Sequence, residues 1–109
     1  MRFRPTAIGY LRSDISGSRQ AWDESRIRTT AALHGFDFAK LIVIDGRTPK
    51  PLLAGLKSTI TRLAAEAVFV PNTQHFDTGT VPTDLLAVAA VITIDPPTTY
   101  PRTATDAQR

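Results

Sequence analysis

Four short apolar runs, each followed by a polar or helix-length segment, constrain the fold of this 109-residue chain. The runs cover residues 7–12, 40–45, 67–70 and 90–94. Apolar runs of this length, bounded by polar and turn-forming residues, are typical of strands that are buried on both faces. Strands that alternate with helices form a parallel sheet with right-handed crossovers. The pattern therefore predicts an α/β fold, a small three-layer sandwich around a mostly parallel four-stranded sheet.

Helices are expected between these runs. Residues 20–34 contain neither proline nor glycine, and Gly35 follows as a typical residue at a helix C-terminus. Trp22 lies on the thin apolar stripe of this segment, and we expect it to pack in the core. Residues 49–65 carry leucine or isoleucine every three or four positions, which predicts an amphipathic helix. A shorter helix is expected at 82–88.

Composition limits the classes of function. Hydrophobic residues make up 42% of the chain, enough for one core. The absence of cysteine excludes a disulfide scaffold, a thiolate metal site and thiol catalysis, and fits a cytoplasmic protein. No apolar run approaches the ~20 residues of a membrane helix, so no membrane association is expected. The net charge of +3 permits contact with nucleic acid without requiring it.

The chain divides into a folded domain at 1–95 and a C-terminal segment at 96–109. The second segment is rich in proline, threonine and charged residues, and we expect a flexible tail there. The two histidines, His34 and His75, have no spacing typical of metal ligands. We therefore expect neither a metal site nor a cofactor.

The segment Ala7-Ile-Gly-Tyr-Leu-Arg12, followed by a polar loop and a long helix, resembles the start of the serine recombinase (resolvase/invertase) catalytic domain. That family opens with a strand of the form apolar-Gly-Tyr-x-Arg-x-Ser. The resemblance spans about residues 5–95 and implies a resolvase-like domain whose strands follow the flavodoxin-like order. It also implies an ancestral activity in which a serine attacks a DNA phosphodiester while arginines neutralise the phosphate.

The chain departs from the family at the catalytic positions. Tyr10 and Arg12 match the motif, but Asp14 occupies the position of the nucleophilic serine, and Ser13 lies one place early. A carboxylate at position 14 would repel a phosphate. In the second family motif, the acid and arginine positions carry Gln74, His75 and Thr78. We therefore expect a degenerate recombinase-like domain that acts as a DNA-associated or protein-interaction module without strand cleavage, rather than as an enzyme.

Two other functions stay open at this point. One is an active recombinase that uses Ser13 with Arg12, and the other is a small regulatory α/β domain that binds an anion or a nucleotide. Arg12, Asp14, Gln74 and His75 each follow a predicted strand, so they should meet at one end of the sheet as an anion- or DNA-binding site. Alternatively, Arg12 and Asp14 form an ion pair without any ligand. The expected partners are duplex DNA, a second copy of the chain or a partner recombinase.

Overall fold

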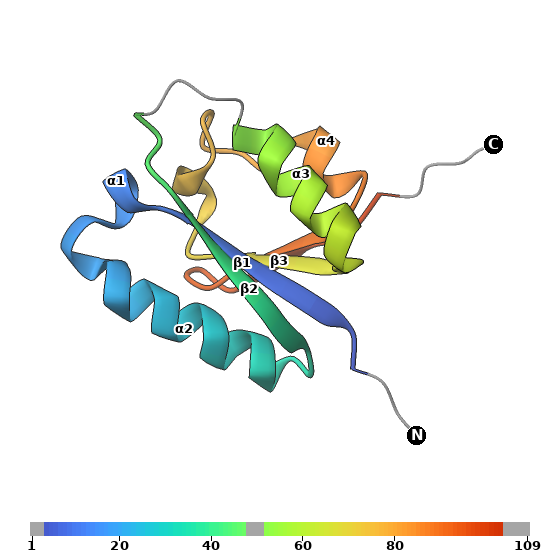
Figure 1. Ribbon diagram of the computed structural model, residues 1–109. Coiled ribbons are helices and arrows are strands. Elements are labelled where there is room, and N and C mark those ends of the chain that lie inside the picture. The colour runs from blue at the N-terminus through green and yellow to red at the C-terminus, as the bar shows by residue number, and fades with distance from the viewer. Residues whose placement is uncertain (1–3, 48–51, 104–109) are drawn as a thin grey trace.

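The computed structural model describes residues 4–47 and 52–103, and Figure 1 shows a twisted sheet with helices on both faces. Its elements, in chain order, are β1 (Thr6–Arg12), α1 (Ser13–Ser16), η1 (Gly17–Arg19), α2 (Gln20–Leu33), β2 (Asp37–Ile44), α3 (Leu52–Leu63), β3 (Ala67–Val70), η2 (Thr73–His75), α4 (Thr83–Leu86), β4 (Ala90–Thr93) and β5 (Thr98–Tyr100). The predicted start of the second long helix falls in residues 48–51, which lie outside the described residues. The α/β class is confirmed.

The sheet has five strands in the order β2-β1-β3-β4-β5. The first four strands run parallel, and β5 runs antiparallel to β4. The prediction of four strands is therefore wrong, because residues 98–100 of the predicted tail form a fifth. Thr98 and Thr99 are β-branched and Tyr100 is aromatic, residue types that suit a strand. Tyr100 pairs with Val91 and packs against the core.

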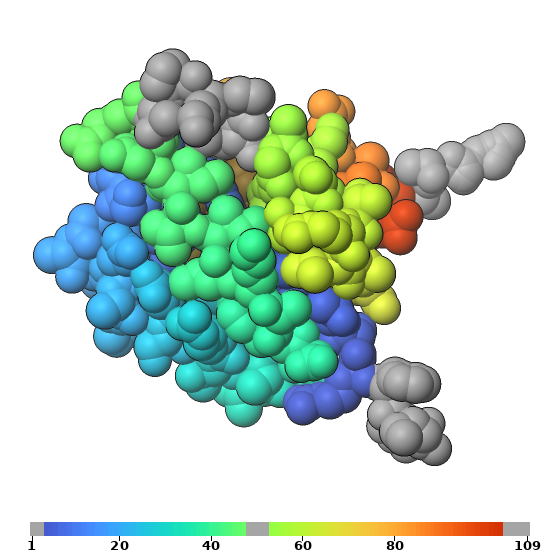
Figure 2. Space-filling view, viewed as in Figure 1, coloured from blue at the N-terminus to red at the C-terminus, as the bar shows by residue number. Residues whose placement is uncertain are grey.

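Two core layers enclose the sheet. The side chains of β1 alternate, so that Ile8 and Tyr10 point to the layer under α3 and α4, while Ala7 and Leu11 point to the layer under α2. The edge strand β2 lies at the surface between α2 and α3 (Figure 2). Among the described residues no helix is long and apolar enough to cross a membrane.

Gly9 explains how closely α2 approaches β1. A Cβ at this position would lie 2.7 Å from Ile27 Cγ2 and 2.8 Å from Leu41 Cδ1, closer than real Cβ contacts come. Only glycine therefore lets the helix pack at this depth. Such a close approach holds the N-terminal end of α2 beside the carboxyl end of β1.

The prediction that Trp22 packs in the core is wrong, since 49% of its surface is exposed. The buried residues of α2 are Asp23, Ile27 and Ala31, spaced four apart along one face. Trp22 precedes this face by one position and so points outward. The inward position is taken by Asp23, whose carboxylate accepts a hydrogen bond from the Ser16 hydroxyl at 2.7 Å. The buried face of α2 therefore differs from the predicted one, because the Ser16–Asp23 pair occupies the inward position.

Candidate functional site

The strand order places a crevice at the carboxyl ends of β1 and β3. Strand β2 pairs with one edge of β1, whereas β3 pairs with the other edge and is followed by β4. In open α/β sheets, ligands bind outside the strand ends at such a switch point. The segments that follow β1 and β3, residues 13–19 and 71–79, line this end of the sheet.

The Arg12 guanidinium lies at the carboxyl end of β1 and makes three hydrogen bonds to carboxylates. Its Nη2 donates to Asp14 Oδ2 at 2.7 Å, and its Nε donates to Asp14 Oδ1 at 3.2 Å. A third contact joins Nη1 to Asp77 Oδ1 at 3.3 Å. The Arg12 and Asp14 side chains are only 14% and 13% exposed. The predicted ion pair is therefore present, and Asp14 neutralises the charge of the Arg12 guanidinium.

Loop residue Gly46 completes this network. Its N–H donates to Asp14 Oδ1 at 2.9 Å. Hydrogen bonds from the Arg12 guanidinium and from this N–H lower the pKa of Asp14 to about 2, so the group is a carboxylate at neutral pH. A Cβ on Gly46 would lie 2.1 Å from Arg12 Nε and Nη2. A side chain at this position would therefore displace the guanidinium from its present place.

The hydroxyl of Ser13 is not arranged for nucleophilic attack. It donates to the Ile44 carbonyl at 3.5 Å, a long contact at the start of α1. Among the described residues it makes no hydrogen bond to a general base. Activation of a serine requires such a base within hydrogen-bond reach. The geometry therefore gives Ser13 the role of a loop contact.

His75 is buried to 1% exposure and anchors the loop after β3 to the end of β1. Its Nδ1 accepts a hydrogen bond from the Arg12 backbone N–H at 2.9 Å, so Nδ1 carries no proton. Tyr10 reinforces this anchor by donating its hydroxyl to the His75 carbonyl at 3.0 Å. Burial lowers the pKa of His75 and raises that of Tyr10 to about 12. Both side chains are neutral at pH 7, and their hydrogen bonds fix the loop after β3 to the end of β1.

Gln74 is the one residue of the predicted set that lies apart. Its side chain is exposed and, within the described part of the chain, makes no hydrogen bond to Arg12, Asp14 or His75. Its backbone N–H donates to Asn72 Oδ1 at 2.9 Å, which caps the short helix η2. The structure thus brings together Arg12, Asp14 and His75, and leaves Gln74 on the loop surface.

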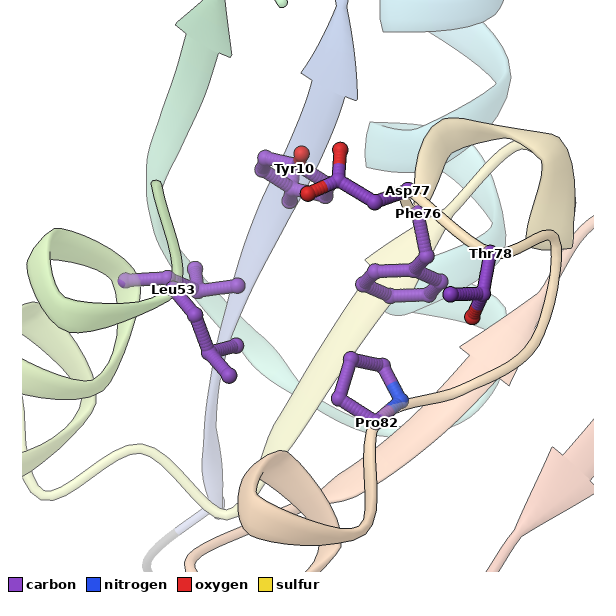
Figure 3. A pocket seen from close by; sticks show the side chains of 7 residues that line it. Tyr10, Leu53, Phe76, Asp77, Thr78 and Pro82 are labelled. Carbon is purple, nitrogen blue, oxygen red and sulfur yellow. The ribbon is translucent and has the colours of Figure 1, made fainter. Parts of the chain in front are cut away.

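A small apolar cavity, which we call the α3 cavity, opens on one side of the Arg12 network. Its volume is about 190 Å³, and it is lined by Tyr10, Leu53, Leu56, Phe76, Asp77, Thr78 and Pro82. Figure 3 shows Leu53, Phe76 and Pro82 around this space. The rings of Tyr10 and Phe76 stack with their centroids 5.6 Å apart. The α3 cavity is thus walled mainly by packed apolar side chains.

A larger and more polar cavity, which we call the α2 cavity, lies on the other side. Its volume is about 320 Å³, and it is lined by Ile15, Ser16, Arg19, Trp22, Asp23, Arg26, Pro71, Asn72, Ile94 and Asp95. The Arg19 and Arg26 guanidinium carbons lie 4.5 and 4.9 Å from the centroid of the Trp22 ring. Sequence reasoning missed this site because it assigned Trp22 to the core. The spacing Arg19-x-x-Trp22-x-x-x-Arg26, which places all three on one helix face, was the available signal.

No protein-family model, curated protein or solved structure matches this chain. Among the described residues, no group of three or more histidine, cysteine or acidic side chains could hold a metal ion. The assignment of function therefore depends on the geometry of the crevice and of the two cavities.

Proposed function

We propose that this chain is a serine-recombinase-like domain that associates with DNA and does not cleave it. The observation that carries this proposal is the Arg12–Asp14 pair, in which the guanidinium donates two hydrogen bonds to one carboxylate. Cleavage needs cations free to stabilise the charge that develops on the scissile phosphate. Here Asp14 neutralises the Arg12 guanidinium, and a second negative charge lies beside it at Asp77.

The crevice also lacks a nucleophile, because Asp14 replaces the serine of the motif. Asp14 holds the motif position of the attacking serine and is an ionised carboxylate at neutral pH. Ser13, the neighbouring hydroxyl, donates to the Ile44 carbonyl. A phosphodiester brought to this crevice would meet two carboxylates and no activated hydroxyl. The chemistry of the crevice thus favours a binding role over catalysis.

Association with DNA is supported by two exposed arginines, Arg19 at the end of η1 and Arg26 in α2. Arg19 and Arg26 are exposed, and neither belongs to an ion pair among the described residues. Exposed guanidinium groups bind phosphate oxygens and release counterions from the duplex. Such contacts carry no sequence information, so the expected binding is independent of DNA sequence.

Incubation of supercoiled plasmid with the protein, with and without Mg²⁺, tests the loss of cleavage. The expected result is no nicked product and no covalent protein–DNA adduct after denaturation. Ser13→Ala is the matched variant, and it should behave like the parent protein in both assays. An adduct or a nick that disappears in Ser13→Ala would overturn the proposal and restore the active recombinase as the function.

A further inference from the structure

We propose that the α2 cavity binds a nucleoside monophosphate, with its phosphate on Arg19 and Arg26 and its base on Trp22. This inference goes beyond the proposed function and rests on the lining of the cavity. Small-molecule sites range from about 300 to 1,000 Å³. The α2 cavity, at about 320 Å³, lies at the lower end of that range and suits one nucleotide rather than two.

The phosphate would sit where positive charge converges. Arg19 and Arg26 line the cavity, and both side chains are exposed without a carboxylate at ion-pair distance in the described part of the chain. The 14-residue helix α2 begins at Gln20, beside Arg19. The N-terminal end of a helix carries partial positive charge and adds to the attraction for an anion.

Trp22 supplies the surface on which a base would stack. An indole ring buries a large apolar area when it packs, yet 49% of Trp22 is exposed at the wall of the cavity. The two guanidinium groups that contact the ring are held by cation–π attraction at an exposed site, which is weak. A nucleobase can displace one of them from the ring and leave it free to bind the phosphate.

The other polar groups of the cavity, two carboxylates and one amide, fit the nucleoside part of the ligand. Asp23 is only 7% exposed, and its Oδ2 accepts the Ser16 hydroxyl. No described residue donates a hydrogen bond to its second oxygen, Oδ1. Asp95 lies on the wall as well. The Asn72 Oδ1 accepts from the Gln74 backbone N–H, and the Asn72 Nδ2 donates to no described residue. These groups fit the amino and hydroxyl groups of a nucleoside.

The balance of charge also disfavours a polyphosphate relative to a monophosphate. Two arginines face two carboxylates in the lining, so the cavity offers little net positive charge. One phosphate is matched by Arg19 and Arg26, whereas a triphosphate would bring further negative charge towards Asp23 and Asp95. We therefore expect a monophosphate to bind more tightly than the corresponding triphosphate.

Intrinsic fluorescence gives a direct test, because Trp22 is the only tryptophan of the chain. The full-length protein is titrated with AMP, with adenosine, with inorganic phosphate and with ATP. The expected result is saturable quenching by AMP. Adenosine and phosphate should each bind with an affinity lower by at least about tenfold, because each lacks one charge-assisted hydrogen bond or one base stack. ATP should also bind more weakly than AMP.

Matched variants locate the site. Arg19→Gln and Arg26→Gln should each weaken AMP binding by about tenfold. Arg28→Gln is the control, because Arg28 is exposed on the same helix, pairs with Glu24 and does not line the cavity. Each of the three substitutions removes one positive charge from an exposed position, so folding should be unaffected. Trp22→Ala, followed by calorimetry, should abolish the preference for AMP over phosphate.

Several results would overturn the inference. They are the absence of saturable quenching by AMP, binding of phosphate as tight as that of AMP, or an equal loss of affinity in Arg28→Gln. A short single-stranded oligonucleotide identifies the source of the nucleotide. If it binds more tightly than AMP and is weakened by Arg19→Gln, the natural ligand is a strand end, which supports the site. Binding of AMP without binding of duplex DNA would refute the proposed function and leave this inference intact.

Discussion

Replacement of Asp14 by asparagine tests whether the Arg12–Asp14 pair holds the crevice together. Asparagine has the same shape, but it turns one acceptor into an amide group that faces Arg12 Nη2, where the contact is now 2.7 Å. Hydrogen bonds to charged groups contribute about 1.5–3 kcal/mol, and this pair is largely shielded from solvent. We therefore expect Asp14→Asn to lower the free energy of unfolding by about 2–3 kcal/mol at neutral pH.

Urea denaturation at several pH values measures this effect and its cause. The pKa of Asp14 is lowered from 3.8 to about 2, so the carboxylate stabilises the fold fully above its unfolded value. That stabilisation is lost as the pH falls from about 4 towards 2, when the native carboxylate takes up its proton. The gap between the parent protein and Asp14→Asn should therefore be constant near pH 7 and close in acid.

Asp45→Asn is the matched control. Asp45 also pairs with an arginine two residues away, Arg47, with an Nη2–Oδ2 distance of 2.9 Å. This second pair is exposed, with 79% of the Arg47 side chain accessible, so water screens it. The control should change stability far less than Asp14→Asn. Equal effects of the two substitutions, or a gap that does not close in acid, would refute the reasoning.

Three further predictions concern packing and titration. Gly9→Ala places a methyl group against Ile27 and should cost about 1–3 kcal/mol in a urea melt, whereas no loss would mean that α2 shifts freely. Gly46→Ala displaces the Arg12 guanidinium, so its effect should not add to that of Asp14→Asn in the double variant. Burial lowers the pKa of His75 below 6.5, so native His75 stays neutral while the unfolded chain binds a proton. Stability should therefore fall as the pH drops below about 6.5, and His75→Asn, which keeps an acceptor for the Arg12 N–H, should flatten that fall.

The first four strands were predictable because each contains an apolar run, and β3 is buried along its whole length. The edge strand β2 begins three residues before its predicted run and is partly exposed, so the expectation that it is buried on both faces is wrong. The fifth strand was not predictable in the same way. Thr98–Tyr100 is three residues long and follows two prolines, so its local sequence is typical of a loop. It is a strand because its backbone pairs with β4, and this depends on contacts that the local sequence does not encode.

In the candidate site, too, the local sequence indicates some contacts and not those between distant segments. Arg12 and Asp14 are close in sequence and follow one strand, so their ion pair was among the predictions. The hydrogen bond from Gly46 and the contact with Asp77 join segments more than thirty residues away, and no local pattern indicates them. Trp22 was placed in the core because it lies on the thin apolar stripe of residues 20–34. Asp23 occupies the buried position of α2 instead, because its carboxylate accepts a hydrogen bond from Ser16. No pattern in the sequence indicates that pairing.

Fluorescence anisotropy of a labelled duplex, titrated with the protein at a series of salt concentrations, tests the central claim that this domain binds DNA without cutting it. Contacts from Arg19 and Arg26 should give a slope of log affinity against log salt of about −2, since each neutralised phosphate contributes about −0.9. Arg19→Gln with Arg26→Gln should flatten that slope, while Arg28→Gln should leave both of these contacts in place. We expect binding that weakens with salt and leaves the duplex intact. Absence of binding at low salt, or cleavage of the labelled strand, would contradict it.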